Sequence, residues 1–444
     1  MYLSQQGLIL YAMKNYKNVI DHSPRSYPEH VTLTRRREPK GANAGTSASI
    51  DAIFDWLLDD AIRERDLLVL FDTFCWRLAA TDLPLDRMSL HVGTLHPQIQ
   101  GFGWGWRRSD GLTDEIQVDQ SVMTTDIFRS SPLQPVIEEG RVFVADTNDP
   151  ELRRRFPLID DLAAEGIRHY IAAPLSANGN FHNAITVATR DPGGFTPAHI
   201  AAFKRVGRPL ALLVDRFIGS RIARNVMDVY LGSVAGKKVL TGSIGRGDGQ
   251  AMKAIIWASD MRGFTHYADN LSAPDVLALL NAYFECVAGA VTAHGGEVLK
   301  FIGDGLLAVF PLEEGNDDSI VAQSSLAAAL HARGALAALN AAPPTELAAA
   351  FALGPIKSGI ALHEGEVFFG NMGSPDRLDF TVIGRAVNAT SRIEALTKTL
   401  GRDILITESV AARIKTNLDD LGAHALRGLD EPLRLFSPRS ADGP

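Results

Sequence analysis

The sequence predicts an α+β protein built from at least two folded domains. Apolar residues recur at intervals of three and four over residues 50–82, which is typical of helices, and short strand-like runs separated by turn residues follow. The second half of the chain alternates strand-like and helical patterns. With 444 residues, the chain is long enough for two or three domains that each bury a core.

Composition excludes several classes of protein. A formal net charge of -8 and a pI near 5.9 argue against a nucleic-acid-binding protein, which would carry a basic face. Every apolar run is broken by a charged residue before about 18 positions, so no membrane span is predicted. Cys75 and Cys286 lie among apolar helical neighbours, as buried reduced thiols do. We therefore expect a cytoplasmic protein that binds neither nucleic acid nor membrane.

The first domain is expected over residues 50–220, after a flexible leader at residues 1–49 whose short apolar stretch does not fit a signal peptide. Its strand-like runs are 88–92, 98–106, 141–145, 170–175 and 182–189.

A run of turn residues after Ala173-Pro174 leads into the last of these strands, and Gly193-Gly194-Phe195-Thr196-Pro197 then starts a helix. In this order of helix, antiparallel sheet and helix, the domain resembles a GAF sensor, with a PAS-like sensor as the alternative. The resemblance implies a small-molecule ligand, which the sequence does not identify.

A long helical pattern begins at Thr196 and Pro197, an N-cap followed by a first-turn proline, and continues to about residue 230. It is interpreted equally well as a signal conduit between domains or as a packed terminal helix. Residues 221–249, rich in glycine toward their end, are expected to form a helical linker or transducing element between the two domains.

The second domain is expected over residues 250–437, with a tail at 438–444. Ser272 is predicted to cap a helix that ends at Gly295-Gly296, and the turn Gly303-Asp304-Gly305 predicts a hairpin. Strand, helix, hairpin, helix and strand is the layout of a ferredoxin-like βαββαβ sheet with its helices on one face.

Two aspartates end strands in this layout. Asp260 follows an apolar strand and Asp304 lies in the hairpin turn, so the fold would place them side by side despite 44 intervening positions. Rigidly held carboxylates are ligands for hard divalent cations, and two such ions can assist an in-line displacement at phosphorus.

Three segments in this order, 254–265, 298–310 and 379–392, resemble the catalytic domain of class III nucleotidyl cyclases, over about residues 254–436. Their motifs are specific: Asp-x-x-Gly-Phe-Thr after a strand, Lys-x-x-Gly-Asp-Gly, and Gly-x-x-Val-Asn-x-x-x-Arg. The resemblance implies two Mg²⁺ or Mn²⁺ ions per site, held by Asp260, Asp304 and the backbone carbonyl of Met261. It also implies substrate contacts for Phe264, Thr265 and Gly303.

In this family the equivalents of Asn388 and Arg392, one helical turn apart, orient the ribose and stabilise the transition state at phosphorus. Lys300 and Thr381 hold the purine-reading positions, and they suit the edge of adenine rather than guanine. This pair resembles the Lys/Thr subgroup, for which bicarbonate sensitivity is a hypothesis. Asp379 is not taken as the missing family aspartate, because two residues on a strand displace it by about 7 Å.

The resemblance further implies a homodimer with two composite active sites, because the metal aspartates of one catalytic domain face the remaining groups of another. The predicted function is an adenylate cyclase that makes cyclic AMP and pyrophosphate from ATP. A guanylate cyclase and a non-catalytic nucleotide-binding signalling module are the alternatives.

Overall fold

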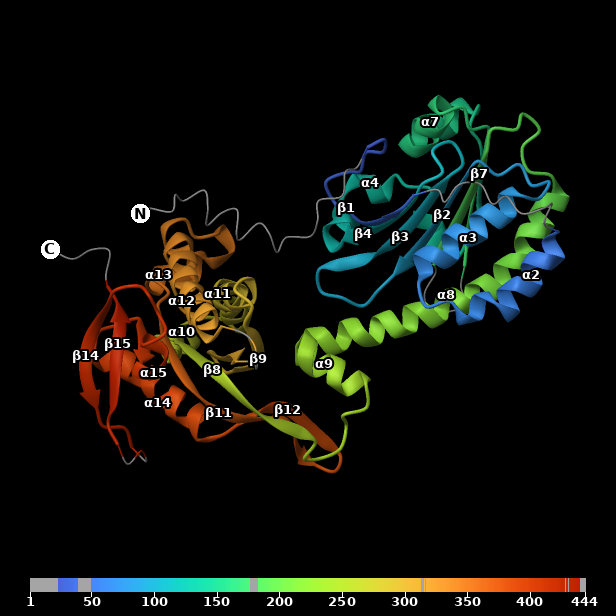
Figure 1. The fold of residues 1–444 in the computed structure, drawn as a ribbon. Helices are drawn as coiled ribbons and strands as arrows, with labels where there is room; N and C mark the ends of the chain where they lie inside the picture. The colour runs from blue at the N-terminus through green and yellow to red at the C-terminus, as the bar shows by residue number, and fades with distance from the viewer. Residues whose placement is uncertain are drawn as a thin grey trace. The chain divides into compact units, whose positions relative to one another are not determined.

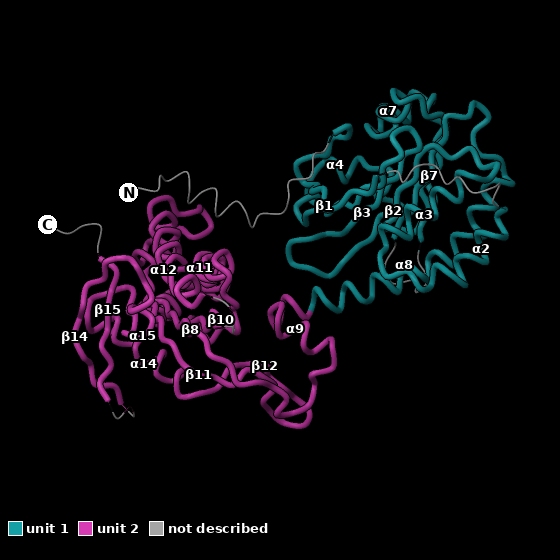
Figure 2. Tube along the Cα trace, viewed as in Figure 1, with its two compact units in different colours: residues 1–226 teal, residues 227–444 magenta. Residues whose placement is uncertain are grey.

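The computed structural model describes residues 23–38, 49–175, 183–312, 315, 317–427, 429 and 431–439. The chain divides into two compact units, residues 1–226 and residues 227–444 (Figure 2). Much of the expected leader, residues 1–22 and 39–48, lies outside the described residues, as does the tail from residue 440.

Unit 1 contains a seven-stranded sheet in which every described pair of neighbours is antiparallel. Its strands are β1 (Val31–Arg37), β2 (Arg87–Gly93), β3 (Ile99–Arg107), β4 (Thr113–Asp119), β5 (Phe143–Asp146), β6 (His169–Pro174) and β7 (Ala184–Thr189). They lie in the order β1-β4-β3-β2-β7-β6-β5, of which Figure 1 labels β1, β4, β3, β2 and β7.

Each face of this sheet has its own helices and its own core. The helical elements of unit 1 are α2 (Ile50–Asp59), η1 (Ala61–Arg63), α3 (Leu67–Ala79), η2 (Gln120–Thr124), α4 (Asp126–Arg129), α5 (Gln134–Glu139), α6 (Pro150–Arg155), α7 (Pro157–Ala164) and α8 (Pro197–Leu231), of which α8 continues past residue 226. The larger core joins α2, α3 and α8 to alternate residues of β2, such as Met88 and Leu90. The smaller core joins Val136 of α5 and Leu162 of α7 to Tyr170 on β6.

The structure contains two strands that the sequence pattern did not predict, β1 and β4. The expected leader is therefore folded at β1. Both strands are charged: Arg36 on β1 lies opposite Asp114 on β4, and their side chains form an ion pair of 2.6 Å. Asp114 is fully buried and also binds Arg25. Because complementary charges replace apolar alternation here, hydrophobic periodicity gives no strand signal.

Unit 2 contains an eight-stranded sheet. Its strands are β8 (Gly249–Met261), β9 (Glu297–Ile302), β10 (Gly305–Leu312), β11 (Ser358–Ser374), β12 (Arg377–Ile383), β13 (Ile404–Thr407), β14 (Leu418–His424) and β15 (Leu433–Pro438). The order is β14-β15-β13-β11-β8-β10-β9, and β12 pairs with β11. The segment β11-β8-β10-β9 is antiparallel, with the strand order and connections of the predicted βαββαβ arrangement.

The two crossover helices of that arrangement, α11 and α12, pack on one face of the sheet, as predicted. The helical elements of unit 2 are α9 (Ser233–Leu240), α10 (Phe264–Asn270), α11 (Ala273–Ala293), α12 (Asp318–Ala341), η3 (Thr345–Leu347), α13 (Ala348–Leu353), α14 (Arg385–Thr399) and α15 (Glu408–Ala411). Ile360 and Leu362 of β11 join the core under α11 and α12, whereas Ala361 between them packs against Ile393 of α14. Side chains alternate along a strand, so α14 covers the opposite face.

Helix α11 is the one helix of the described residues that is long and apolar enough to cross a membrane by length and composition. Its residues Leu279, Tyr283, Val287 and Val291 are buried in the core of unit 2. The Ser272 side chain caps its start, as the sequence predicted. Packing against the sheet therefore accounts for its apolar face.

Candidate active site

The fold brings the two strand-ending aspartates together. Asp260 lies near the end of β8, and its partner across the antiparallel pair is Gly305, the first residue of β10. Asp304 immediately precedes Gly305 in the hairpin turn. Gly303 in the same turn has a φ of +61°, a conformation that favours glycine. The predicted side-by-side placement of the two aspartates therefore follows from strand register and from a turn that needs glycine.

The proximity of Asp304 changes the acidity of Asp260. Partial burial, the charge of Asp304 and a hydrogen bond with it raise the pKa of the Asp260 carboxyl to about 6 from its ordinary value of 3.8. Like charges at close range favour either protonation of one group or binding of a cation. The site therefore attracts a proton or a cation.

Buried hydrogen bonds fix the end of β8. The hydroxyls of Tyr283 on α11 and Ser358 on β11 are 2.9 Å apart, and Ser358 donates to the backbone carbonyl of Asp260 at 3.1 Å. The Met261 side chain is buried in the core next to this point. Neither Ser358 nor Tyr283 was singled out from the sequence, because their roles depend on which residues of β11 and α11 face β8.

A third carboxylate, Glu394 on α14, lies near the aspartates. Burial and the charge of Asp260 raise its pKa to about 7. Gly359 lies opposite Asp260 on β11, and a Cβ atom there would collide with the side chains of Glu394 and Thr397. Glycine at this position therefore lets α14 approach the strand. Sequence analysis missed Glu394, although it follows Arg392 by only two positions.

A second group of predicted residues lies on β9 and β12. The Lys300 ammonium contacts the Asp379 carboxylate at 3.2 Å, so Asp379 pairs with the lysine. Thr381 is 2% exposed, and its hydroxyl has no hydrogen-bond partner among the described residues. It lines an open cavity of about 350 Å³ together with Arg246 and Asn371. A buried hydroxyl without a partner costs roughly 1–3 kcal/mol, so this position suits contact with a ligand or water.

The third group lies on α14. Asn388 is exposed and Arg392 is half-buried one turn further along. Among the described residues, neither side chain forms a hydrogen bond or ion pair with another residue. Both polar groups are therefore available to a substrate or to a second chain.

Among the described residues, these three groups are not linked to one another by hydrogen bonds or ion pairs. Phe264 and Thr265 begin α10, directly after Gly263. They follow Asp260 closely in the sequence. In the described parts of the chain, no hydrogen bond or ion pair links Lys300, Asn388 or Arg392 to the two aspartates.

The donor set at Asp260 and Asp304 fits a hard divalent cation that draws its other ligands from outside the protein. No group of three or more His, Cys, Asp or Glu side chains able to hold a metal occurs among the residues that the structure describes. Mg²⁺ commonly binds through one or two carboxylates and completes its shell with water and substrate phosphates. A two-carboxylate site is therefore suited to a metal that arrives with a nucleotide.

Comparison with known proteins agrees with this geometry. Residues 250–436 match a family model described as "Adenylate and Guanylate cyclase catalytic domain". An adenylate cyclase of Anabaena cylindrica is 35% identical over 189 residues, which are 43% of this chain and 35% of that protein. The chain spans about a third or less of the length of the first curated relatives that it matches.

Two solved structures are similar over a comparable share of the chain. A bacterial light-regulated adenylyl cyclase is 30% identical, with 43% of this chain and 91% of that chain covered and a TM-score of 0.36. The guanylyl cyclase Cya2 is 29% identical, with 42% and 92% covered and a TM-score of 0.37. From the family match, the sequence identity and the geometry of the aspartate pair, we conclude that residues 250–436 are an adenylate and guanylate cyclase catalytic domain.

Proposed function

We propose that this chain is an adenylate cyclase that converts ATP to 3′,5′-cyclic AMP and pyrophosphate. The observation that carries the proposal is the register-enforced pairing of Asp260 and Asp304 inside a cyclase catalytic domain. In the reaction, the 3′-oxygen of ribose loses its proton and bonds to the α-phosphorus. The bond from that phosphorus to the bridging oxygen breaks, and pyrophosphate leaves.

Each step places negative charge on oxygen, so fixed positive charge and oriented donors are the main catalytic requirement. Asp260, Asp304 and the Met261 carbonyl would hold two Mg²⁺ or Mn²⁺ ions. When bound, these ions neutralise charge on the 3′-oxygen and the triphosphate. Arg392 donates to the reacting phosphate, and Asn388 orients the ribose. Phe264, Thr265 and Gly303 complete the substrate contacts beside the aspartates.

The choice of ATP over GTP rests on two residues, because similar solved chains include both adenylyl and guanylyl cyclases. Adenine offers N1 as an acceptor and its 6-amino group as a donor. Lys300 donates to the former, and the unpartnered Thr381 hydroxyl accepts from the latter. The Asp379 contact holds the lysine side chain extended toward β12.

We propose that the active form is a homodimer with two composite sites. In support, the described contacts of one chain leave Asn388 and Arg392 unpaired and unconnected to the aspartates. Unit 2 also exposes apolar side chains on the strands and turns around the site: Phe301, Ile302, Phe368, Met372 and Ile383. Burial of these side chains against a second copy would remove apolar surface from water, which is compatible with the proposed dimer.

Unit 1 is proposed as a GAF-like sensor with a small-molecule ligand. An antiparallel sheet with helices on both faces and an internal cavity supports this role. A cytoplasmic location is proposed with it, supported by the free thiols of Cys75 and Cys286. A non-catalytic nucleotide-binding module remains the alternative from a different class, and bicarbonate sensitivity stays a hypothesis.

Product formation tests the main proposal. The purified chain should make cyclic AMP from ATP with Mg²⁺ or Mn²⁺, and Asp304→Ala should lose at least about 100-fold in rate because a metal ligand is removed. Asp269→Ala, an exposed α10 residue, is the matched control and should retain activity. Cyclic GMP as the main product would instead establish the guanylate cyclase. A folded dimer with no product would favour the non-catalytic module.

Mixing two inactive variants tests the composite site. Asp260→Ala and Arg392→Ala chains should each be inactive, whereas a heterodimer keeps one of its two sites intact. Random reassociation of equal amounts should therefore restore about a quarter of the parent rate. Heterodimers that are demonstrably formed but remain inactive would contradict the arrangement.

Substitution of the purine-reading pair tests substrate choice. Lys300→Glu combined with Thr381→Cys should raise the KM for ATP by about tenfold or more and admit GTP, because the donor at N1 becomes an acceptor. Steady-state rates with both nucleotides measure the change. An unaltered ATP preference would show that these residues do not contact the base.

The acidity of Asp260 predicts a pH-dependent stability in the absence of divalent ions. Its pKa of about 6 lies above the unfolded value of 3.8, so the folded chain binds more protons between these values. The free energy of unfolding therefore falls as pH rises from 4 to 6. Asp304→Asn removes the like charge and should raise the urea midpoint in EDTA at pH 7.5 but not at pH 4.

Asp269→Asn serves as the control for that experiment and should change the midpoint little at either pH. A midpoint for Asp304→Asn equal to or below that of the parent at pH 7.5 would show that the two carboxylates do not repel each other in the folded chain.

A further inference from the structure

Unit 1 contains a cavity of about 170 Å³ on the sheet face that points away from α3 and α8. One wall is the outward side of β2, where Arg87, Ser89 and His91 alternate with core residues. The opposite wall is apolar and includes Leu158 and Leu162 of α7. The cavity therefore has one polar and one apolar wall, as small-molecule sites do.

The residues of β3 determine the shape of this cavity. Gly103 and Gly105 face it, and they pair with His91 and Ser89 on β2. A Cβ atom built on Gly105 would meet nothing within 4 Å, so the glycine leaves open space. The alternate residues Trp104 and Trp106 are buried on the other face. The tryptophans thus fill one face of β3, while on the other face Gly105 leaves open space and Gly103 leaves room for the Ile116 side chain.

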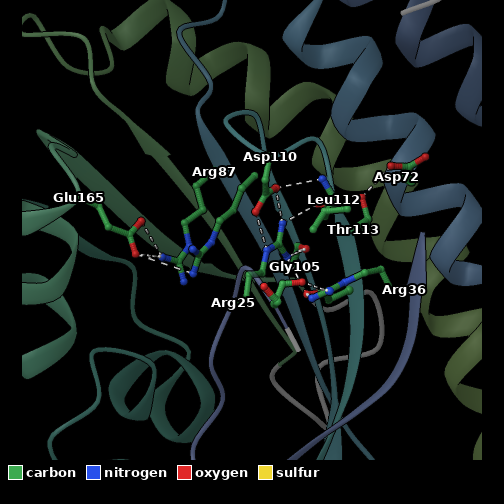
Figure 3. A network of polar contacts seen from close by, with 12 residues as sticks. Arg25, Arg36, Asp72, Arg87, Gly105, Asp110, Leu112, Thr113 and Glu165 are labelled. Atoms are coloured by element: carbon green, nitrogen blue, oxygen red, sulfur yellow. Dashed lines mark hydrogen bonds and ion pairs between the residues drawn. The ribbon is translucent and has the colours of Figure 1, made fainter. Parts of the chain in front are cut away.

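The charged groups that line the cavity are all of one sign. Arg25, Arg87 and Arg107 line it, and no acidic residue does so among the described residues. Arg25 is saturated: it donates to the carboxylates of Asp110 and Asp114 and to two backbone carbonyls (Figure 3). Its charge is therefore neutralised within the fold.

Arg87 and Arg107 are not saturated in this way. They face each other across β2 and β3 and share one carboxylate, Glu165, at 3.4 Å and 3.8 Å (Figure 3 shows Arg87 and Glu165). Charge-assisted bonds of this type are normally about 2.7–2.9 Å long. Burial and the neighbouring Arg107 lower the pKa of Arg87, so a second anion would be favourable here.

Neutral polar groups continue along the same wall. The Ser89 hydroxyl lies 2.8 Å from Nε2 of His91 and 2.5 Å from the Thr186 hydroxyl. Burial and Arg87 lower the pKa of His91 to about 4, so its ring is neutral at pH 7. These groups offer hydrogen bonds without adding charge.

We propose that this cavity binds a small organic anion, with its carboxylate or phosphate at Arg87 and Arg107 and an apolar body between the β3 glycines and Leu162. A cavity of about 150 Å³ is known to hold benzene, so the ligand is the size of a ring with one small substituent. The inference gives a ligand class to the proposed sensor. Its test measures binding, so it fails or succeeds independently of cyclic AMP formation.

The test uses thermal unfolding and calorimetry of the full chain with four probes: benzoate, phenyl phosphate, uncharged benzamide and inorganic phosphate. We expect benzoate or phenyl phosphate to bind and to raise the Tm of the chain. The affinity for benzamide and for inorganic phosphate should be at least about tenfold lower. The stronger of the two organic anions identifies carboxylate or phosphate as the head group. Equal binding of benzamide, or no binding of either organic anion, would overturn the proposal.

Variants locate the binding. The double variant Arg87→Gln, Arg107→Gln should bind the organic anion with an affinity at least about tenfold lower than that of the parent chain. Gly105→Val should abolish binding by filling the cavity, and it leaves the ion pairs untouched. Gly93→Val is the matched control, since a Cβ there also meets nothing within 4 Å and the residue lies outside this cavity. Binding that survives Gly105→Val, or that Gly93→Val removes equally, would place the anion elsewhere.

Discussion

The close approach of two carboxylates at the end of β8 is the constraint on which the catalytic half of this protein depends. Antiparallel pairing of β8 with β10 sets Gly305 opposite Asp260 and leaves Asp304 no position but the adjacent turn. Like charges at this distance oppose folding, so the surroundings must hold the strand end rigidly. The Ser358 hydroxyl does so by donating to the Asp260 backbone carbonyl, and the Tyr283 hydroxyl bonds in turn to Ser358. The carboxylate oxygens therefore stay available to a cation.

The same constraint explains why the site is divided among elements. Glu394, with a pKa raised to about 7, already adds a third acidic group on α14 beside the pair. The positive and donor groups, by contrast, are separate: Lys300 pairs with Asp379 on β12, and Arg392 is unpaired in the described contacts. In the proposed homodimer, the aspartates of one chain are the acidic half of a site, and Lys300, Asn388 and Arg392 of the other chain are its basic half. Two copies related by a two-fold axis would supply each acidic half with a basic one.

Sequence alone predicted the parts of this arrangement that depend on local pattern. Asp260 and Asp304 are recognisable because each ends a strand, and Ser272 because it precedes a helix. Ser358 and Gly359 were not predicted, since their roles follow from pairing with residues almost 100 positions away. Strands β1 and β4 were missed for another reason: the Arg36–Asp114 pair replaces the apolar alternation that marks a strand.

The contacts between β3 and α8 bear on whether α8 is a signal conduit or only a packed helix. The glycines of β3 face the cavity, while the Trp104 indole on its other face donates to Glu115 at 3.3 Å. Arg221 of α8 binds the same Glu115 at 3.1 Å and stacks on Phe102 of β3 at 3.5 Å. Glu115 is buried and the Arg221 side chain is partly exposed, so a shift of α8 at this point would either remove this partner from a buried carboxylate or move β3. A change in the position of β3 would therefore reach α8, which continues past residue 226, as the conduit interpretation requires.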